Sequence, residues 1–530
     1  MKPDLYQMVS LLLVGASGTA WSDSQEEKKP NILIAFADDW GRYSDAYSGL
    51  EGESPLHDLV KTPNFDRVAR QGVLFNNAHV SAPSCTPSRS ALLSGQYFWR
   101  TGRGAVLLGD DAWDFSIPSF PLMLRDQGGY HIGQTYKVWG PALPKDAPYD
   151  GTKHEYERHG TAFNTFSQDA TRLMDVQGKS LEDARQVLYD EVLGNFEDFL
   201  DDRKPGQPLC YWWGPRNTHR SWTKGSGKRL WGIDPDQLKG KLPAFMPDVP
   251  DVREDFADYL GEICALDHGL GLLLNRLEEI GELDNTIVIV SGDHGPPGFP
   301  RGKANLYDFG TRVPLAIMWP KQIPPGRIVD DFVNLTDLAP TFLESAGMNI
   351  PDVMTGRSLM NVLLSKKSGW VDPSRDYVVT GRETHCNTYP SRAIRTKDWL
   401  YIYNFRPELW PAGNPVDIEG GTHPTYEQLE TRTWPILIDM DASPTKAWLV
   451  TNQKNEECNG AYYYDLAFAK RPQEELYRIA DDSCTITNLA ANPEFQNVKA
   501  ELKTRLMDEL KRYADPRLTS DIFDKPPFAR

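Results

Sequence analysis

Two short, mainly apolar runs that end at acidic residues constrain the fold of this chain more than any other feature. Residues 31–37 form the first run, which ends at Asp38, and residues 286–291 form the second, which ends just before Asp293. Continuous apolar character, rather than alternation, is typical of strands covered on both faces, as in a parallel sheet flanked by helices. Residues 209–213 predict a third strand of the same kind.

Helical patterns separate the predicted strands. Apolar residues recur at helical spacing over residues 252–281, which end at a glycine, and residues 336–346 predict another helix. Strands that alternate with helices indicate an α/β fold with a doubly wound, mostly parallel sheet flanked by helices. We expect this N-terminal domain to span residues 30–375.

The pattern changes after residue 375. Residues 393–405 alternate around large aromatic side chains, residues 462–464 and 475–477 predict further strands, and residues 496–513 predict an amphipathic helix. We therefore expect residues 376–530 to form a smaller C-terminal α+β subdomain with an antiparallel sheet.

Four polar side chains fall at the predicted ends of two parallel strands: Asp38, Asp39, Asp293 and His294. In open α/β sheets, ligands bind beyond the carboxyl ends of the strands. An Asp pair alone is common in turns, but two such pairs at one edge favour a site. Carboxylate oxygens suit Ca²⁺ or Mg²⁺.

The overall charge argues against one class of function. The chain has 57 Lys and Arg against 74 Asp and Glu, a net charge of −17, whereas nucleic-acid binding requires a basic surface. An anionic substrate would need a local basic pocket that overcomes this field.

Residues 1–22 predict a signal peptide. Lys2 precedes an apolar run over residues 8–15, followed by small residues, and the run is too short to span a bilayer. The alternative is a disordered N-terminus. No later segment has the length and apolarity of a membrane span, so we expect an exported protein, periplasmic or secreted, without a membrane partner.

Six cysteines are few for a chain of 530 residues. Cys210 and Cys264 lie in apolar runs, which predict burial. Export would permit disulfides, and Cys458 with Cys484 is the pair that we expect, although spacing alone does not fix the connectivity.

The surroundings of Cys85 set it apart from the other cysteines. It lies in the string SCTPSR at residues 84–89, which SALLSG follows, and a helix is expected to begin near Pro87. A helix N-terminus stabilises negative charge through its free N–H groups and its dipole. The forked Arg89 guanidinium suits sulfate or phosphate oxygens. An isolated cysteine there would be an ordinary buried residue, but the complete string favours an anion site.

The string C-x-P-S-R followed by A-L-L-S-G resembles the maturation and active-site motif of type I, formylglycine-dependent sulfatases, in the alkaline-phosphatase-like superfamily. The resemblance extends over residues 30–350 and includes PNIL before Asp38, SGDHG at 291–295 and GKANLY at 302–307. It implies that a sulfatase-maturing enzyme converts Cys85 to 3-oxoalanine (formylglycine), whose hydrated aldehyde is the nucleophile.

The resemblance also implies roles for individual residues. The implied ligands of a Ca²⁺ ion, or of Mg²⁺ as the alternative, are Asp38, Asp39, Cys85, Asp293 and His294. The implied catalytic residues are Cys85, Arg89, Lys137, His219 and Lys303. The three cations among them would neutralise the sulfate oxygens, and the histidine would protonate the leaving oxygen. At position 294, histidine replaces the more usual Asn or Gln.

One departure from the family pattern concerns proton transfer. Many sulfatases have a histidine shortly after the lysine that corresponds to Lys137, whereas this chain has Trp139 and Gly140 there. More of the acid–base work would then fall on His219. Further candidates, for anionic-sugar subsites, are Arg216, Arg301, Arg382 and His385.

The function we expect is hydrolysis of sulfate esters on a sulfated polysaccharide or oligosaccharide. Two alternatives keep the fold: an N-sulfoglucosamine-type sulfohydrolase, and a phosphodiesterase or phosphonate monoester hydrolase. A third, of another class, is an inactive sulfatase-like protein that only binds glycans.

Overall fold

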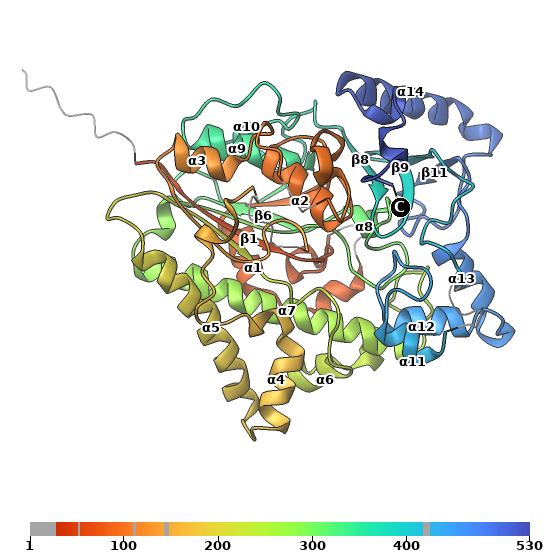
Figure 1. The fold of residues 1–530 in the computed structure, drawn as a ribbon, viewed down its shortest axis with the longest axis horizontal. Coiled ribbons are helices and arrows are strands. Elements are labelled where there is room, and N and C mark those ends of the chain that lie inside the picture. Colours follow the sequence, from red (N-terminus) through yellow and green to blue (C-terminus); the bar gives the residue numbers. More distant parts are fainter. Residues whose placement is uncertain (1–27, 51–53, 110–112, 142–147, 417–423, 530) are drawn as a thin grey trace, which may run out of the picture.

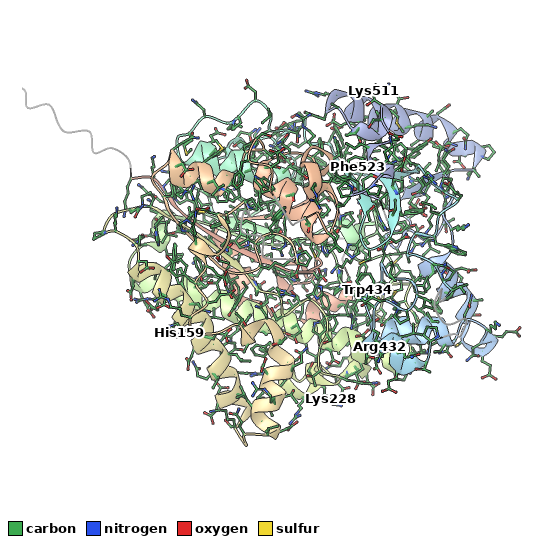
Figure 2. All side chains as sticks on the ribbon, viewed as in Figure 1. His159, Lys228, Arg432, Trp434, Lys511 and Phe523 are labelled. Carbon is green, nitrogen blue, oxygen red and sulfur yellow. The ribbon has the colours of Figure 1, made fainter. Side chains whose placement is uncertain are left out.

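The computed structural model describes residues 28–50, 54–109, 113–141, 148–416 and 424–529. The expected signal peptide lies outside these residues. None of the helices within them is long and apolar enough to cross a membrane. Charged side chains such as Lys228 and Lys511 lie at the surface (Figure 2).

A seven-stranded sheet forms the centre of the N-terminal part, in the order β3-β4-β1-β5-β6-β2-β7. Its strands are β1 (Asn31–Ala37), β2 (Val73–His79), β3 (His131–Tyr136), β4 (Leu209–Gly214), β5 (Thr286–Gly292), β6 (Leu315–Met318) and β7 (Arg327–Asn334). All neighbouring pairs are parallel except those that involve β6. The predicted mostly parallel sheet is therefore confirmed.

Helices cover both faces of this sheet, because its strands are apolar on both sides (Figure 1). One face packs against α1 (Pro63–Gln71), α4 (Phe166–Asp175), α5 (Leu181–Asp201), α6 (Ser226–Trp231) and α7 (Pro250–Glu279). The other packs against α2 (Cys85–Ser94), α3 (Phe120–Asp126), α9 (Leu338–Ser345) and α10 (Met360–Leu363). The short helix α8 (Asp308–Thr311) precedes β6. The two predicted helices correspond to α7 and α9, whereas α2 begins at the cysteine itself, two residues before Pro87.

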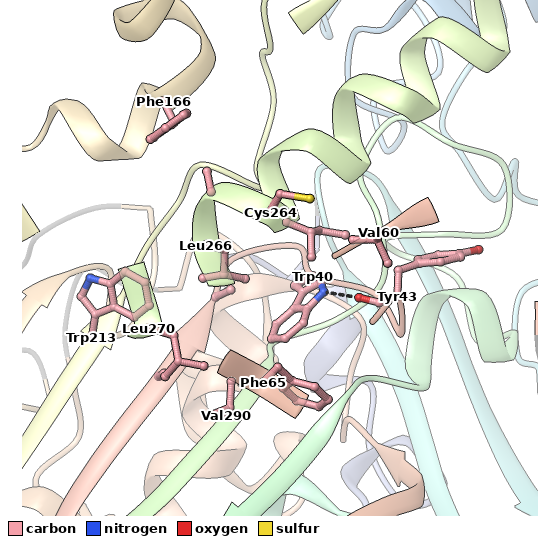
Figure 3. Close-up of a cluster of buried hydrophobic side chains, with 14 of the residues drawn as sticks. Trp40, Tyr43, Val60, Phe65, Phe166, Trp213, Cys264, Leu266, Leu270 and Val290 are labelled. Carbon is pink, nitrogen blue, oxygen red and sulfur yellow. Dashed lines mark hydrogen bonds between the residues drawn. The ribbon is translucent and has the colours of Figure 1, made fainter. Parts of the chain in front are cut away.

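Large side chains beneath the strand ends anchor the turn after β1. The Trp40 indole packs edge-on against Phe65 and donates a hydrogen bond of 3.1 Å to the Tyr43 carbonyl (Figure 3). Leu266 and Leu270 of α7 belong to the same buried cluster. Burial of these rings fixes the residues that directly follow β1.

The C-terminal part contains a four-stranded antiparallel sheet in the order β11-β10-β9-β8. Its strands are β8 (Tyr377–Thr384), β9 (Thr388–Thr396), β10 (Trp399–Asn404) and β11 (Glu474–Arg478). Between β10 and β11 lie α11 (Tyr426–Thr431), α12 (Pro444–Thr451) and α13 (Gly460–Phe468). The predicted terminal helix is α14 (Gln496–Arg512), which packs on the sheet.

Two predictions for this part are wrong. Residues 462–464 form part of α13 instead of a strand, because Tyr464 and Phe468, one turn apart, bury a common face against the cluster around α12. Cys458 and Cys484 are free thiols. They cannot pair because Cys458 packs with the helices α11–α13, whereas Cys484 packs against the core of the N-terminal part.

Candidate active site

The turn after β1 directs two carboxylates to one point at the carboxyl edge of the sheet. Asp39 has a positive φ of 63°, a conformation that is uncommon for a residue with a side chain. The Tyr259 hydroxyl donates to its carbonyl at 3.0 Å, and its own N–H donates to Asp293 Oδ1 at 2.8 Å. These contacts from α7 and β5 hold the turn in place.

The residues after β5 complete this acidic group. His294 Nε2 lies 3.2 Å from Asp39 Oδ1 and 3.6 Å from Asp293 Oδ1. All three side chains are fully buried. The residues after β1 and β5, which the sequence predicts to form one site, are therefore in contact.

Cys85 enters this group from the first turn of α2. Its Sγ lies 3.6 Å from Asp38 Oδ1, 3.9 Å from Asp39 Oδ1 and 3.4 Å from His294 Nε2. Burial and the charge of Asp38 raise the pKa of the thiol to about 12. In the metal-free protein the side chain is therefore a neutral thiol, whereas a nucleophilic cysteine requires a thiolate.

Three buried cations surround the carboxylates. Lys137 Nζ lies 2.6 Å from Asp38 Oδ1, Arg89 Nε lies 2.8 Å from Asp293 Oδ2, and Lys303 Nζ lies 2.9 Å from Asp39 Oδ2. Burial opposes ionisation of Asp38, yet Lys137 and Arg89 hold its pKa well below the usual value. The site therefore contains ionised carboxylates surrounded by Arg89, Lys137 and Lys303. These three cations form the local basic pocket that an anionic substrate would need.

The acidic group has the chemistry of a divalent-cation site. Potential ligand atoms of Asp39, Cys85, Asp293 and His294 all lie within 4.8 Å of one another. Asp38 Oδ2 is buried and lacks a hydrogen-bond partner among the described residues, which is costly unless a ligand compensates it. The residues present thus fit a hard cation.

His219 lies on the open side of the site, in the loop after β4. Its Nε2 is 3.9 Å from Asp39 Oδ2, and the side chain is 26% exposed. Asn217 in the same loop donates from Nδ2 to Glu262 Oε2 of α7 at 3.0 Å. Helix α7 therefore positions the loop that carries the histidine.

The four subsite candidates have different surroundings. Arg301 donates to the Thr485 carbonyl at 2.6 Å, and Arg382 pairs with buried Asp439, so both guanidinium groups have partners within the fold. Arg216 is 47% exposed, with its Nε 3.9 Å from Asp38 Oδ2.

His385, the fourth candidate, reaches the site from the turn between β8 and β9. Its Nδ1 lies 2.8 Å from the Oγ of Ser84, the residue before Cys85. At the position where the resemblance predicts a histidine, Trp139 instead donates from Nε1 to Ser90 Oγ at 2.7 Å.

Asp441, in the loop between α11 and α12, also lies at the site, although the sequence does not predict it there. Its Oδ2 is 3.6 Å from Lys303 Nζ. No motif or strand end in the sequence distinguishes this residue, because only the tertiary fold brings it to the site.

Two family models match the chain. The model described as "Sulfatase" matches residues 30–348, and the model described as "N-sulphoglucosamine sulphohydrolase, C-terminal" matches residues 299–412. The first alone spans more than half of the chain.

Known proteins resemble the chain along most of its length. N-sulphoglucosamine sulphohydrolase of Homo sapiens is 28% identical over 510 residues, which cover 91% of this chain and 89% of that protein. An ulvan-active sulfatase of Formosa agariphila is 25% identical, covering 90% of this chain and 74% of that protein.

Solved structures share the fold at lower sequence identity. One was determined in complex with its substrate D-glucosamine-2-N,6-O-disulfate. It has a TM-score of 0.59 at 19% identity, over 92% of this chain and 99% of the other. The phosphonate monoester hydrolase of Agrobacterium radiobacter has a TM-score of 0.60 at 17% identity, over 92% and 96% of the two chains.

Proposed function

Because the chain belongs to the sulfatase family and is a sulfuric ester hydrolase, we propose that it removes sulfate from a sulfated oligosaccharide or polysaccharide. One observation carries the proposal. Cys85, at the N-terminus of α2, lies within 4 Å of Asp38, Asp39 and His294, with three cations around them. The names of the relatives, which refer to ulvan and to N-sulphoglucosamine, support a saccharide substrate.

The reactive group that we propose is formylglycine, made from Cys85 by a sulfatase-maturing enzyme. The raised pKa of the thiol supports this assignment, because a neutral buried thiol is a poor nucleophile. When present, the hydrated aldehyde supplies an oxygen nucleophile at the position of Sγ.

The metal that we propose is Ca²⁺, with Mg²⁺ as the alternative, held by Asp38, Asp39, Cys85, Asp293 and His294. Such an ion supplies Lewis acidity toward a sulfate oxygen. The orphaned Oδ2 of Asp38 supports this ligand set.

The remaining proposed roles follow from position and charge. Arg89, Lys137 and Lys303 bind the sulfate oxygens and neutralise the charge that develops on them, which is preorganised stabilisation by fixed donors. His219 is partly exposed on the open side, so we assign to it the proton that the leaving oxygen requires.

Two alternative substrates keep the same residues. N-sulfate is one, supported by the human relative, and a phosphodiester or phosphonate is the other, supported by the shared fold. Lys137 and Lys303 favour sulfate. Parallel assays of O-sulfated sugar, N-sulfoglucosamine and a phosphodiester distinguish the three substrates by their kcat/KM values.

The proposal includes export and a division of the chain. Residues 1–22 would be the signal peptide, residues 30–375 the catalytic domain and residues 376–530 the C-terminal subdomain. The change from the parallel to the antiparallel sheet just before β8 supports the second boundary.

Mass spectrometry of the tryptic peptide from Gln71 to Arg89 tests the central step. Protein from the native host should carry an aldehyde in place of the Cys85 thiol and should release sulfate. Cys85→Ala should fold and release none. A persistent thiol in an active enzyme, or turnover by the variant, would refute the assignment of the nucleophile.

A further inference from the structure

Asp441 reaches the active site from outside the two regions that the family models match, residues 30–348 and 299–412. Its Oδ2 lies 3.6 Å from Lys303 Nζ, and no residue in the described part of the chain donates a hydrogen bond to that oxygen. A largely buried carboxylate oxygen without a donor is destabilising.

The surroundings of Asp441 keep its carboxylate ionised. Burial opposes ionisation, but Lys303, His219, His385 and Arg220 together hold the pKa of the group below its usual range. An ionised carboxylate only accepts hydrogen bonds. The side chain is 19% exposed, and because Oδ2 is covered, this exposure belongs to the rest of the side chain.

The loop that carries Asp441 is held from both sides. Lys446 donates from Nζ to the Met440 carbonyl at 2.8 Å. Ser443 donates from Oγ to the Gly298 carbonyl of the N-terminal part at 2.8 Å. The carboxylate is therefore positioned before substrate binds, which lowers the entropic cost of a contact to substrate.

The two neighbours of Asp441 locate it relative to a substrate. Lys303, 3.6 Å from Asp441, would bind the sulfate, and His219, whose charge acts on Asp441, would face the leaving oxygen, so we place Asp441 toward the alcohol half of the ester. In a sugar, the carbons around that oxygen carry hydroxyl or amine groups. These groups are hydrogen-bond donors, and an ionised carboxylate accepts from such donors.

We propose that Asp441 is a specificity-determining residue, whose carboxylate accepts a hydrogen bond from a hydroxyl or N–H group of the sugar beside the scissile sulfate. The same charge disfavours sugars that carry a second anionic group at that point. This inference rests on the proposed function.

The test compares two substrates in the full-length, matured enzyme. The first substrate is the monosulfated monosaccharide, chosen from a panel, that the wild type hydrolyses with the highest kcat/KM. The reference is 4-nitrophenyl sulfate, which has no hydroxyl or N–H donor. Asp441→Ala should lower kcat/KM on the sugar about tenfold or more relative to the aryl sulfate, the effect expected for loss of a hydrogen bond to a charged group.

The control variant is Asp465→Ala, which removes an exposed carboxylate from α13 in the same region and should leave both rates unchanged. If Asp441→Ala fails to fold, Asp441→Asn replaces it as the test variant. Because this change removes the negative charge, it should raise kcat/KM on a disulfated sugar relative to a monosulfated sugar. Equal losses on sugar and aryl sulfate would mean that Asp441 only balances the charge of Lys303, and would overturn the inference. An unchanged rate on the sugar would overturn it as well. A wild type that hydrolyses the aryl sulfate but no sugar would instead refute the proposed function.

Discussion

Lys137 and Asp38 bury opposite charges 2.6 Å apart, and each depends on the other in the metal-free protein. Asp38 accepts only from Lys137, Arg89 and the Cys85 thiol through Oδ1, while Oδ2 lacks a hydrogen-bond partner among the described residues. Removal of one member of a buried pair leaves an uncompensated charge, at a cost of about 3–5 kcal/mol. A cation bound at Asp38 would supply part of the missing compensation.

Lys137→Met should therefore lower the thermal midpoint of the metal-free protein, and added CaCl₂ should restore more stability to the variant than to the wild type. In the matured enzyme, kcat/KM should fall about 100-fold or more, as expected for loss of a preorganised donor to the reacting group. Calorimetry with and without calcium and steady-state kinetics measure the two effects. Lys153→Met, at an exposed lysine, is the control, and an unchanged kcat/KM for Lys137→Met would contradict the role in sulfate binding.

Helix α7 carries buried acids that accept hydrogen bonds from the loop after β4 and from helices α4 and α1. Glu262 accepts from Asn217 Nδ2 at 3.0 Å and from the Ser167 N–H at 3.2 Å. Asp267, on the same helix, accepts from the Phe65 N–H at 2.7 Å. Burial raises the pKa of Glu262 from 4.5 to about 7 and that of Asp267 from 3.8 to about 7. Both acids should be protonated in the folded protein at mildly acidic pH.

A raised pKa in the folded state has a defined effect on stability. The contribution of Glu262 is fully present below the unfolded pKa near 4.5 and is lost as the pH rises through about 7. In Glu262→Gln, which cannot ionise, the free energy of unfolding should decline less between these pH values, by on the order of 2–3 kcal/mol. Urea unfolding at pH 4.5, 6 and 8 measures this difference; parallel pH profiles for variant and wild type would contradict it.

Local patterns in the sequence predict the elements that are set by local burial. Strands β1, β4 and β5 are apolar on both faces, so their composition alone indicates a covered parallel sheet. The run of three tyrosines at residues 462–464 favours a strand by propensity, whereas packing against α12 decides the helical conformation of α13. Asp441 could not be predicted, since no periodicity relates its loop to strand ends more than a hundred residues away.

The C-terminal part is hydrogen-bonded to the segment that follows Lys303. Glu475 of β11 accepts from the Tyr307 hydroxyl at 2.8 Å, from the Tyr477 hydroxyl at 2.6 Å and from Asn404 Nδ2 at 2.8 Å. The carboxylate is 2% exposed. The antiparallel sheet is thereby coupled to the segment of the N-terminal part that follows Lys303.

Glu475→Ala should leave the buried Tyr307 and Tyr477 hydroxyls without their acceptor, whereas Asn404 Nδ2 keeps its bond to the Pro472 carbonyl. The free energy of unfolding should therefore fall by about 2 kcal/mol or more. Activity should fall as well, because the segment around Lys303 loses an anchor. Denaturant unfolding and kcat/KM measure both effects. Glu474→Ala, which removes the adjacent, more exposed carboxylate, should lower the free energy of unfolding less. Equal losses in the two variants would show that the effect does not come from the hydrogen bonds to Glu475.

The position of Cys85 within the first turn of α2, 3% exposed, has a consequence for the timing of synthesis. A modifying enzyme that needs this cysteine in extended chain must act before Asp293, which follows about 200 residues later, arrives to close the site. At about 5–20 residues per second this leaves roughly 10–40 s. If Cys85 is modified as we propose, this modification competes with folding of the chain around it. Slower translation between Cys85 and Asp293 should therefore raise the fraction of chains in which Cys85 is modified.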